Sequence, residues 1–294
     1  MSASAAAAER AGPESMTAST RAGDVVLAYV SGQVDALNRA IAATERYAPG
    51  SAGSVRVAIH RLRTVLRGYA HLFTGTPRGG RELDQLLSAL KHTEDLERLS
   101  VHFEDRFDQL GLTEPEFPAW HASLEAQVRD SYRQIERVHS QTWVAVLLGQ
   151  VRMFAEHADF TREGEKPASS LMGVLSQSKT HLLDVNGKLS HATDLVLARD
   201  ETRVAARETR FLAEAAEPAL GQPATDVVVP TTDLEYLLNR YRQAVIARNW
   251  LLRLPGADRA DKLTASLADL EKEHLRQLGD DIDRATSTMI ERWR

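Results

Sequence analysis

The sequence contains no cysteine among its 294 residues, and aromatic residues make up only 6% of it. Without cysteine, disulfides, cysteine-ligated metal sites and thiol nucleophiles are excluded. The chain also lacks any run of about 18 uncharged apolar residues, and its beginning has neither the basic start nor the apolar core of a signal peptide. We therefore expect no membrane span and no export, and the cytoplasm as the default location.

The sequence has no overall excess of positive charge either. Its formal net charge is -5 at pH 7, with 43% hydrophobic and 26% charged residues, which is an ordinary globular composition. A negative chain is not held on nucleic acid by its overall charge, so we expect no specific nucleic-acid partner. Any site for an anion must be local.

Alternating Val, Ile and Thr, the pattern of a β-sheet, is missing, because the short run 227–229 is bounded by Asp226 and Pro230. Helical spacing dominates instead from Asp24 onward, with Pro218, Gly221, Pro223 and Pro230 expected to interrupt the chain before a helix over 232–252. We predict an all-α fold of two similar halves. The expected organisation is a flexible leader (1–22), a first helical repeat (23–160), a linker rich in charge, Gly, Pro and Ser (161–170), and a second helical repeat (171–294).

The most informative stretch is 55–73, where two stripes run along one predicted helix. At 100° per residue the apolar residues fall within a sector about 80° wide, which is typical of a face packed on a core. A basic stripe at i, i+4, i+7 and i+11 lies about 110° from it. The apolar stripe consists of Val55, Ile59, Leu62, Leu66, Tyr69 and Phe73, and the basic stripe of Arg56, His60, Arg63 and Arg67.

The basic spacing recurs in the second half. Arg56-Val57-Ala58 is matched by 203–205, His60 by Arg207 and Arg63 by Arg210, and each copy lies on the second predicted helix of its half. Repetition of the same spacing at the same place indicates an internal duplication. The planar guanidinium fork of Arg suits phosphate oxygens, so the facing stripes predict a site for a phosphate-rich anion.

Three alternatives stay open at this point. Charged rows are commonly solvated helix faces, and these arginines could instead pair with acids of neighbouring helices in a structural or partner-binding bundle. The anion could also be a nucleotide or another polyanion. An enzyme is disfavoured, because the sequence has no GxxxxGK[ST] or HExxH motif and its ten histidines are scattered. We predict no catalytic residue, no metal site and no cofactor.

These motifs resemble those of the CHAD family, α-helical domains named for conserved histidines. The first family signature is matched by RVAIHRLRTVLRGY from Arg56 onward, including Arg61 and Leu62. The second resembles the pattern at Arg203, Arg207, Arg210, Phe211 and Glu214, and the family's Asp at the end of the third helix is matched by Asp95 in the first repeat and replaced by Gln243 in the second.

The resemblance implies a fold of two repeats of about four helices each around a central basic channel. It also implies binding of inorganic polyphosphate, in some members on polyphosphate granules. The expected binding residues are Arg56, His60, Arg63, Arg67, Arg203, Arg207 and Arg210, and Lys91, Lys179 and Lys188 could add to the wall.

The chain departs from the family at the histidines. Gly53 and Asp200 occupy the two positions where the family has its eponymous His, and His60 stands where the family has Arg. With an ordinary pKa of about 6.5, His60 would carry only part of a charge at neutral pH.

Overall fold

A computed structural model of the protein describes residues 16–75 and 80–294. Within those ranges no strand forms, and only two isolated bridges occur, Arg21 with Pro167 and Phe73 with Phe160. The predicted all-α class is confirmed. The helices are α1 (Ala22–Thr44), α2 (Ser51–Gly68), η2 (Ala70–Leu72), α3 (Gly80–Gln109), η3 (Glu114–Glu116), α4 (Ala119–His139), α5 (Thr142–His157), η4 (Ala168–Leu171), α6 (Met172–Gly187), η5 (Lys188–His191), α7 (Leu195–Leu220), α8 (Gln222–Arg253), α9 (Gly256–Arg259) and α10 (Lys262–Trp293).

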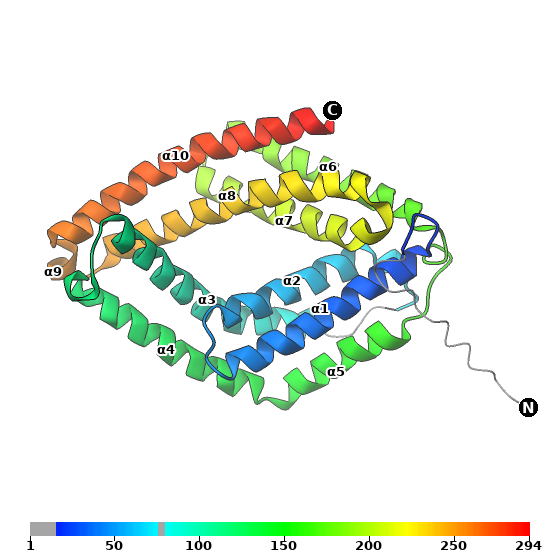
Figure 1. Ribbon diagram of the computed structural model, residues 1–294, viewed down its shortest axis with the longest axis horizontal. Helices are drawn as coiled ribbons and strands as arrows, with labels where there is room; N and C mark the ends of the chain where they lie inside the picture. Colours follow the sequence, from blue (N-terminus) through cyan, green and yellow to red (C-terminus); the bar gives the residue numbers. More distant parts are fainter. Residues whose placement is uncertain (1–15, 76–79) are drawn as a thin grey trace, which may run out of the picture.

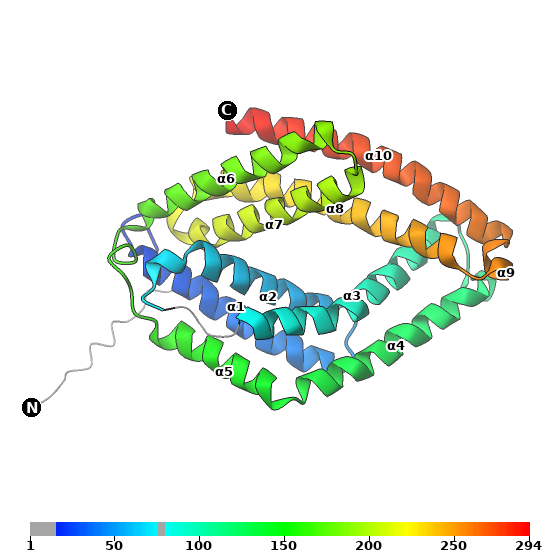
Figure 2. The same cartoon turned by 180° about the vertical axis from the view of Figure 1, so that it is seen from behind.

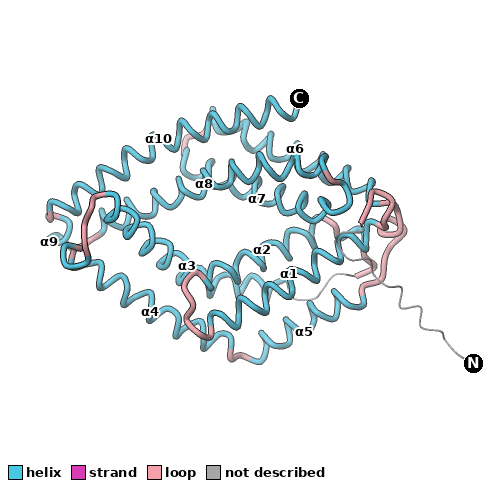
Figure 3. Tube along the Cα trace, viewed as in Figure 1, coloured by secondary structure: helices cyan, strands magenta, loops and turns pink. Residues whose placement is uncertain are grey.

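The helices form two halves that meet at both ends of an elongated molecule. In Figure 1, α1 to α5 make the lower half and α6 to α10 the upper half, with an opening between them. The view from behind places α2 and α7 alongside each other across the middle (Figure 2). The loops gather at the periphery, as the tube trace shows (Figure 3). No helix in the described ranges is long and apolar enough to cross a bilayer.

Two of the three hydrophobic clusters contain side chains of both halves. The first, built mainly by α1 and α2, includes Leu212 of α7 and Val227 of α8. The third joins Phe103 and Phe107 of α3 to Leu251 of α8. The second cluster lies within the second half, between α6, α7, α8 and α10. Because burial of apolar surface is the main stabilising term, each half depends on the other for its core.

The expected interruption before residue 232 is wrong, since α8 runs unbroken from Gln222. Pro223 lies in the first turn, where a helix has no use for an amide proton. Pro230 lies inside the helix and leaves the carbonyl of Asp226 without its usual donor. The indole Nε1 of Trp293 in α10 donates to that oxygen at 3.0 Å instead. A partner from another helix thus replaces the missing helical hydrogen bond.

The segment 161–170, expected as a linker, connects α5 to η4 and hydrogen-bonds to the start of α1. The amides of Ala22 and Gly23 donate to the carbonyls of Lys166 and Gly164, at 2.8 and 2.9 Å. These bonds satisfy donors that a helix N-terminus leaves free. Of the expected leader, residues 1–15 lie outside the described residues.

Candidate anion-binding site

The apolar stripe of α2 is buried as its spacing predicts. Every member from Val55 to Phe73 is at most 7% exposed. At the end of the helix, the Tyr69 hydroxyl donates to the carbonyl of Leu212 at 2.9 Å. A Cβ placed on Gly68 would lie only 2.4 Å from a methyl carbon of Leu212, so α2 and α7 are closely packed there. This contact fixes which flank of α2 is turned toward α7.

The basic stripe meets its counterpart from the second half at this seam. His60 experiences the charges of Arg207, Arg56, Arg63 and Arg203 together, in that order of strength. We call these five residues the α2–α7 cation cluster. Two helices far apart in the sequence therefore bring five of the seven predicted residues together.

Within the cluster, His60 is neutral. Burial, followed by the repulsion of the arginines around it, lowers its pKa to about 3. The partial charge expected from the sequence is therefore wrong for the folded protein without ligand. Its buried Nε2 has no hydrogen-bond partner among the described residues.

Arg207 is the least compensated cation of the cluster. Burial and the nearby Arg203 lower its pKa to about 10, against weaker opposing effects of Glu235 and Glu208. It remains charged at neutral pH. Its Nε is buried without a hydrogen-bond partner, and no carboxylate of the described residues lies within ion-pair distance.

The other predicted arginines each have an acidic partner, which supports the salt-paired alternative in part. Most of these acids come from helices other than the one carrying the arginine. The pairs are Arg56 with Glu94, Arg63 with Asp84 at 2.6 Å, Arg67 with Glu208 at 2.6 Å, Arg203 with Asp200 at 2.8 Å, and Arg210 with both Glu214 and Glu235 at 2.8 Å.

Arg210 takes part in a network that joins the two halves. Its partner Glu214 also accepts hydrogen bonds from Tyr29 of α1 at 2.9 Å and from Arg61 of α2 at 3.1 Å. Breaking a part-buried ion pair by removing one partner destabilises a fold. Arg210 and Arg61 therefore hold the halves together, although the resemblance places Arg210 among the binding residues.

Sequence reasoning missed Arg242 of α8, which lies 3.6 Å from both Asp95 and Asp200. It also missed Arg98 of α3, which pairs with Glu94 at 2.8 Å. Neither belongs to a repeated spacing, so no pattern pointed to them. Of the lysines suggested for the wall, Lys179 lies 4.9 Å from the centre of the Trp293 ring.

A cavity of about 1400 Å³ occupies the opening between the halves. It is lined by α1, α2, α3, α4, α8 and α10, and none of the seven predicted residues lines it. The face of α2 that borders it carries Gly53, Val57 and Arg61. Its other charged lining residues are of both signs: Arg98, Arg106, Arg129, Arg133 and Arg240 with Glu94, Glu97, Glu104 and Asp105.

Comparison with known proteins identifies the fold. The family model for the CHAD domain matches residues 28–252. The chain belongs to the CHAD family. Its fold is similar to PptA from Streptomyces chartreusis (TM-score 0.70, 15% identity, 91% of this chain and 100% of that one) and to the crystal structure of the CHAD domain from the plant Ricinus communis (TM-score 0.73, 15% identity, 93% of each chain). No curated protein matches the sequence.

Proposed function

We propose that this CHAD protein binds inorganic polyphosphate at the α2–α7 cation cluster, without catalysis. The observation that carries the proposal is the state of Arg207 and His60. Both are partly buried, each has a buried nitrogen without a hydrogen-bond partner, and neighbouring cations lower both pKa values. A phosphate oxygen would supply the missing acceptor and the missing negative charge at once.

The remaining arginines of the cluster would extend this contact along the chain of phosphates. Arg63 is about one-third exposed, and its partner Asp84 is more exposed still. Surface ion pairs of this kind contribute little, about 0–1 kcal/mol, so a phosphate can replace the carboxylate at low cost. Arg67 is 65% exposed and continues the row. The proposal includes the family's expected address, polyphosphate granules in the cytoplasm.

The test is calorimetric titration of medium-chain polyphosphate into the wild type and Arg207→Gln. We expect the variant to lose about tenfold or more in affinity, as is typical when a charge-assisted hydrogen bond to an anion is removed. Binding should weaken as salt rises, because counter-ions are released. The matched control is Arg276→Gln, which removes an exposed arginine of α10 that pairs with Glu273 and Asp280. Equal affinity of Arg207→Gln and wild type would refute the assignment to this cluster.

The competing function is a structural or partner-binding bundle whose arginines are neutralised internally. The observation in its favour is that five of the six predicted arginines have a carboxylate partner. In that case the wild type would bind no polyphosphate, and Arg207→Gln would stabilise the fold by relieving repulsion. A single-stranded oligonucleotide as competitor distinguishes polyphosphate from other polyanions, because displacement at equal charge would indicate a general polyanion site.

A further inference from the structure

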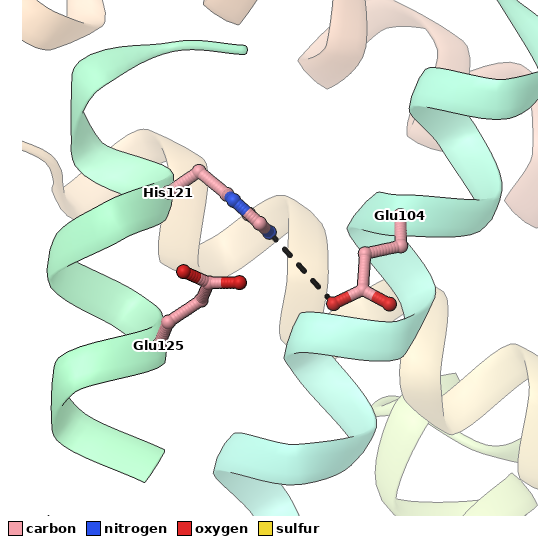
Figure 4. Close-up of side chains that lie close together, drawn as sticks. All are labelled: Glu104, His121 and Glu125. Atoms are coloured by element: carbon pink, nitrogen blue, oxygen red, sulfur yellow. Dashed lines mark ion pairs between the residues drawn. The ribbon is translucent and has the colours of Figure 1, made fainter. Parts of the chain in front are cut away.

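A second cluster of polar side chains lies between α3 and α4, away from the arginines of α2 and α7. His121 and Glu125 of α4 face Glu104 of α3 (Figure 4). One donor atom from each residue can be chosen such that all three lie within 4.8 Å of one another. We propose that these residues bind a divalent transition-metal ion of the Zn²⁺ class.

The state of His121 is the main argument. The residue is only 5% exposed, and its buried Nε2 has no hydrogen-bond partner among the described residues. Phe107 and Phe117 contact the imidazole edge-on, with ring centres 5.3 and 5.2 Å away, and so hold the ring in place. Buried polar atoms without a partner are rare in native proteins, and an unmodelled ion is one of their usual causes.

The geometry needs only a small adjustment to close around an ion. Nε2 of His121 lies 4.0 Å from a carboxylate oxygen of Glu104. Ligand bonds of about 2.0–2.2 Å in tetrahedral geometry place donors about 3.4 Å apart. Glu104 is about half exposed and can rotate toward the ion. His121 and Glu125 are four residues apart on α4, a spacing that puts both on one face of a helix.

The donor set indicates the class of metal. One imidazole nitrogen with two carboxylates suits Zn²⁺ and related ions, whereas Mg²⁺ and Ca²⁺ prefer oxygen donors only. Two carboxylates also balance the charge of a divalent ion. Glu104 lines the large cavity as well, so the ion would stand at the cavity wall, where water would complete its coordination. The ion would tie α3 to α4 close to the turn that joins them.

The sequence gave no indication of this site, because its three residues come from two helices and form no metal-binding motif. The only regularity, His121 followed four residues later by Glu125, is common on helices. Packing of Phe107 against Phe117, with ring centres 4.4 Å apart, is part of what places α4 against α3. The site therefore depends on tertiary structure.

The test is titration of Zn²⁺ into the full chain without an affinity tag, followed by calorimetry. We expect one ion per chain for the wild type, and a loss of about tenfold or more in affinity for Glu104→Gln and for Glu125→Gln, since even the supporting residues of metal sites have effects of that size. Both substitutions keep the side-chain shape, and Glu104 is on the surface, so folding is preserved. Mg²⁺ should bind far more weakly than Zn²⁺.

The matched control is His157→Gln. His157 also lies near a glutamate, with Nδ1 3.9 Å from Glu156, but it is 65% exposed. Zn²⁺ should bind this variant as it binds the wild type, and Co²⁺ in place of Zn²⁺ should give visible absorption bands that Glu104→Gln lacks. The proposal is overturned if the wild type binds no Zn²⁺, if both glutamine variants retain full affinity, or if Mg²⁺ binds as tightly. Polyphosphate binding is measured without metal, so the two proposals fail independently.

Discussion

His60 shows how strongly one residue's chemistry depends on its neighbours. On an isolated helix its pKa would be close to 6.5, but burial and the arginines on both α2 and α7 lower it to about 3. The folded protein therefore holds fewer protons at this position than the unfolded chain below the ordinary pKa. Stability contributed by neutral His60 is complete at neutral pH and is lost as pH falls from about 6.5 toward 3.

This sign gives a prediction for His60→Gln. From about pH 7 to about pH 5 the wild type should lose stability relative to the variant, by of order 1 kcal/mol or more, because only the wild type has this histidine to protonate on unfolding. Urea unfolding of both proteins at the two pH values measures the difference. A constant difference between them would show that the pKa of His60 is not lowered.

Periodicity predicts which residues share a helix face, but it cannot name their partners on other helices. The basic stripe was therefore located correctly on α2 and α7, while its neutralisation was missed. Glu94 and Asp84 belong to α3, and nothing in the spacing of the stripe indicates that they face it. The same limit hid the uncompensated state of Arg207, which results from the absence of a carboxylate in three dimensions.

At the scale of the elements, the helices were predictable wherever apolar spacing persisted, and wrong where a rule about proline was applied without tertiary context. In α8, Trp293 supplies the donor that Pro230 removes. That bond joins residues 67 positions apart, a distance at which a local rule has no information. The start of α1 is similar, since its capping bonds come from the segment 161–170.

Gly164 is essential to that connecting segment. A Cβ there would lie 2.2 Å from the carbonyl oxygen of Leu72, a backbone atom that cannot move aside. We expect Gly164→Ala to destabilise the protein by about 1–3 kcal/mol, the usual range for overpacking. Chemical denaturation measures the change in the free energy of unfolding.

The matched variant is Gly149→Ala in the exposed face of α5, where a Cβ would meet nothing within 4 Å. Alanine is the better helix former, so this variant should gain about 0.5–1 kcal/mol. Destabilisation by both variants to the same degree would mean that the close contact at Gly164 has no special role.

At the scale of the whole molecule, the all-α class and the CHAD fold followed from the sequence, whereas the interdependence of the halves did not. Two of the three hydrophobic clusters cross between the halves. We expect fragments 1–160 and 161–294 to fail to unfold cooperatively when alone, and to associate when co-expressed, because each covers the apolar surface of the other.

Co-purification of the untagged fragment with a tagged partner, followed by circular dichroism, tests this expectation. Leu212→Asp in the second fragment is the control, since it places a charge in the shared cluster and should prevent association. Independent cooperative folding of either fragment would contradict the expectation.

The positions of the two shared clusters have a consequence for the cavity. One cluster closes the end where α7 and α8 meet, and the other closes the end near α9, with the cavity between them (Figure 1). Any hinge rotation that widened the cavity would have to separate packed side chains at one end or the other. Such a cavity has a fixed span and selects molecules by size and reach. Adaptation to different occupants is left to its long, exposed side chains, such as Arg129 and Arg133.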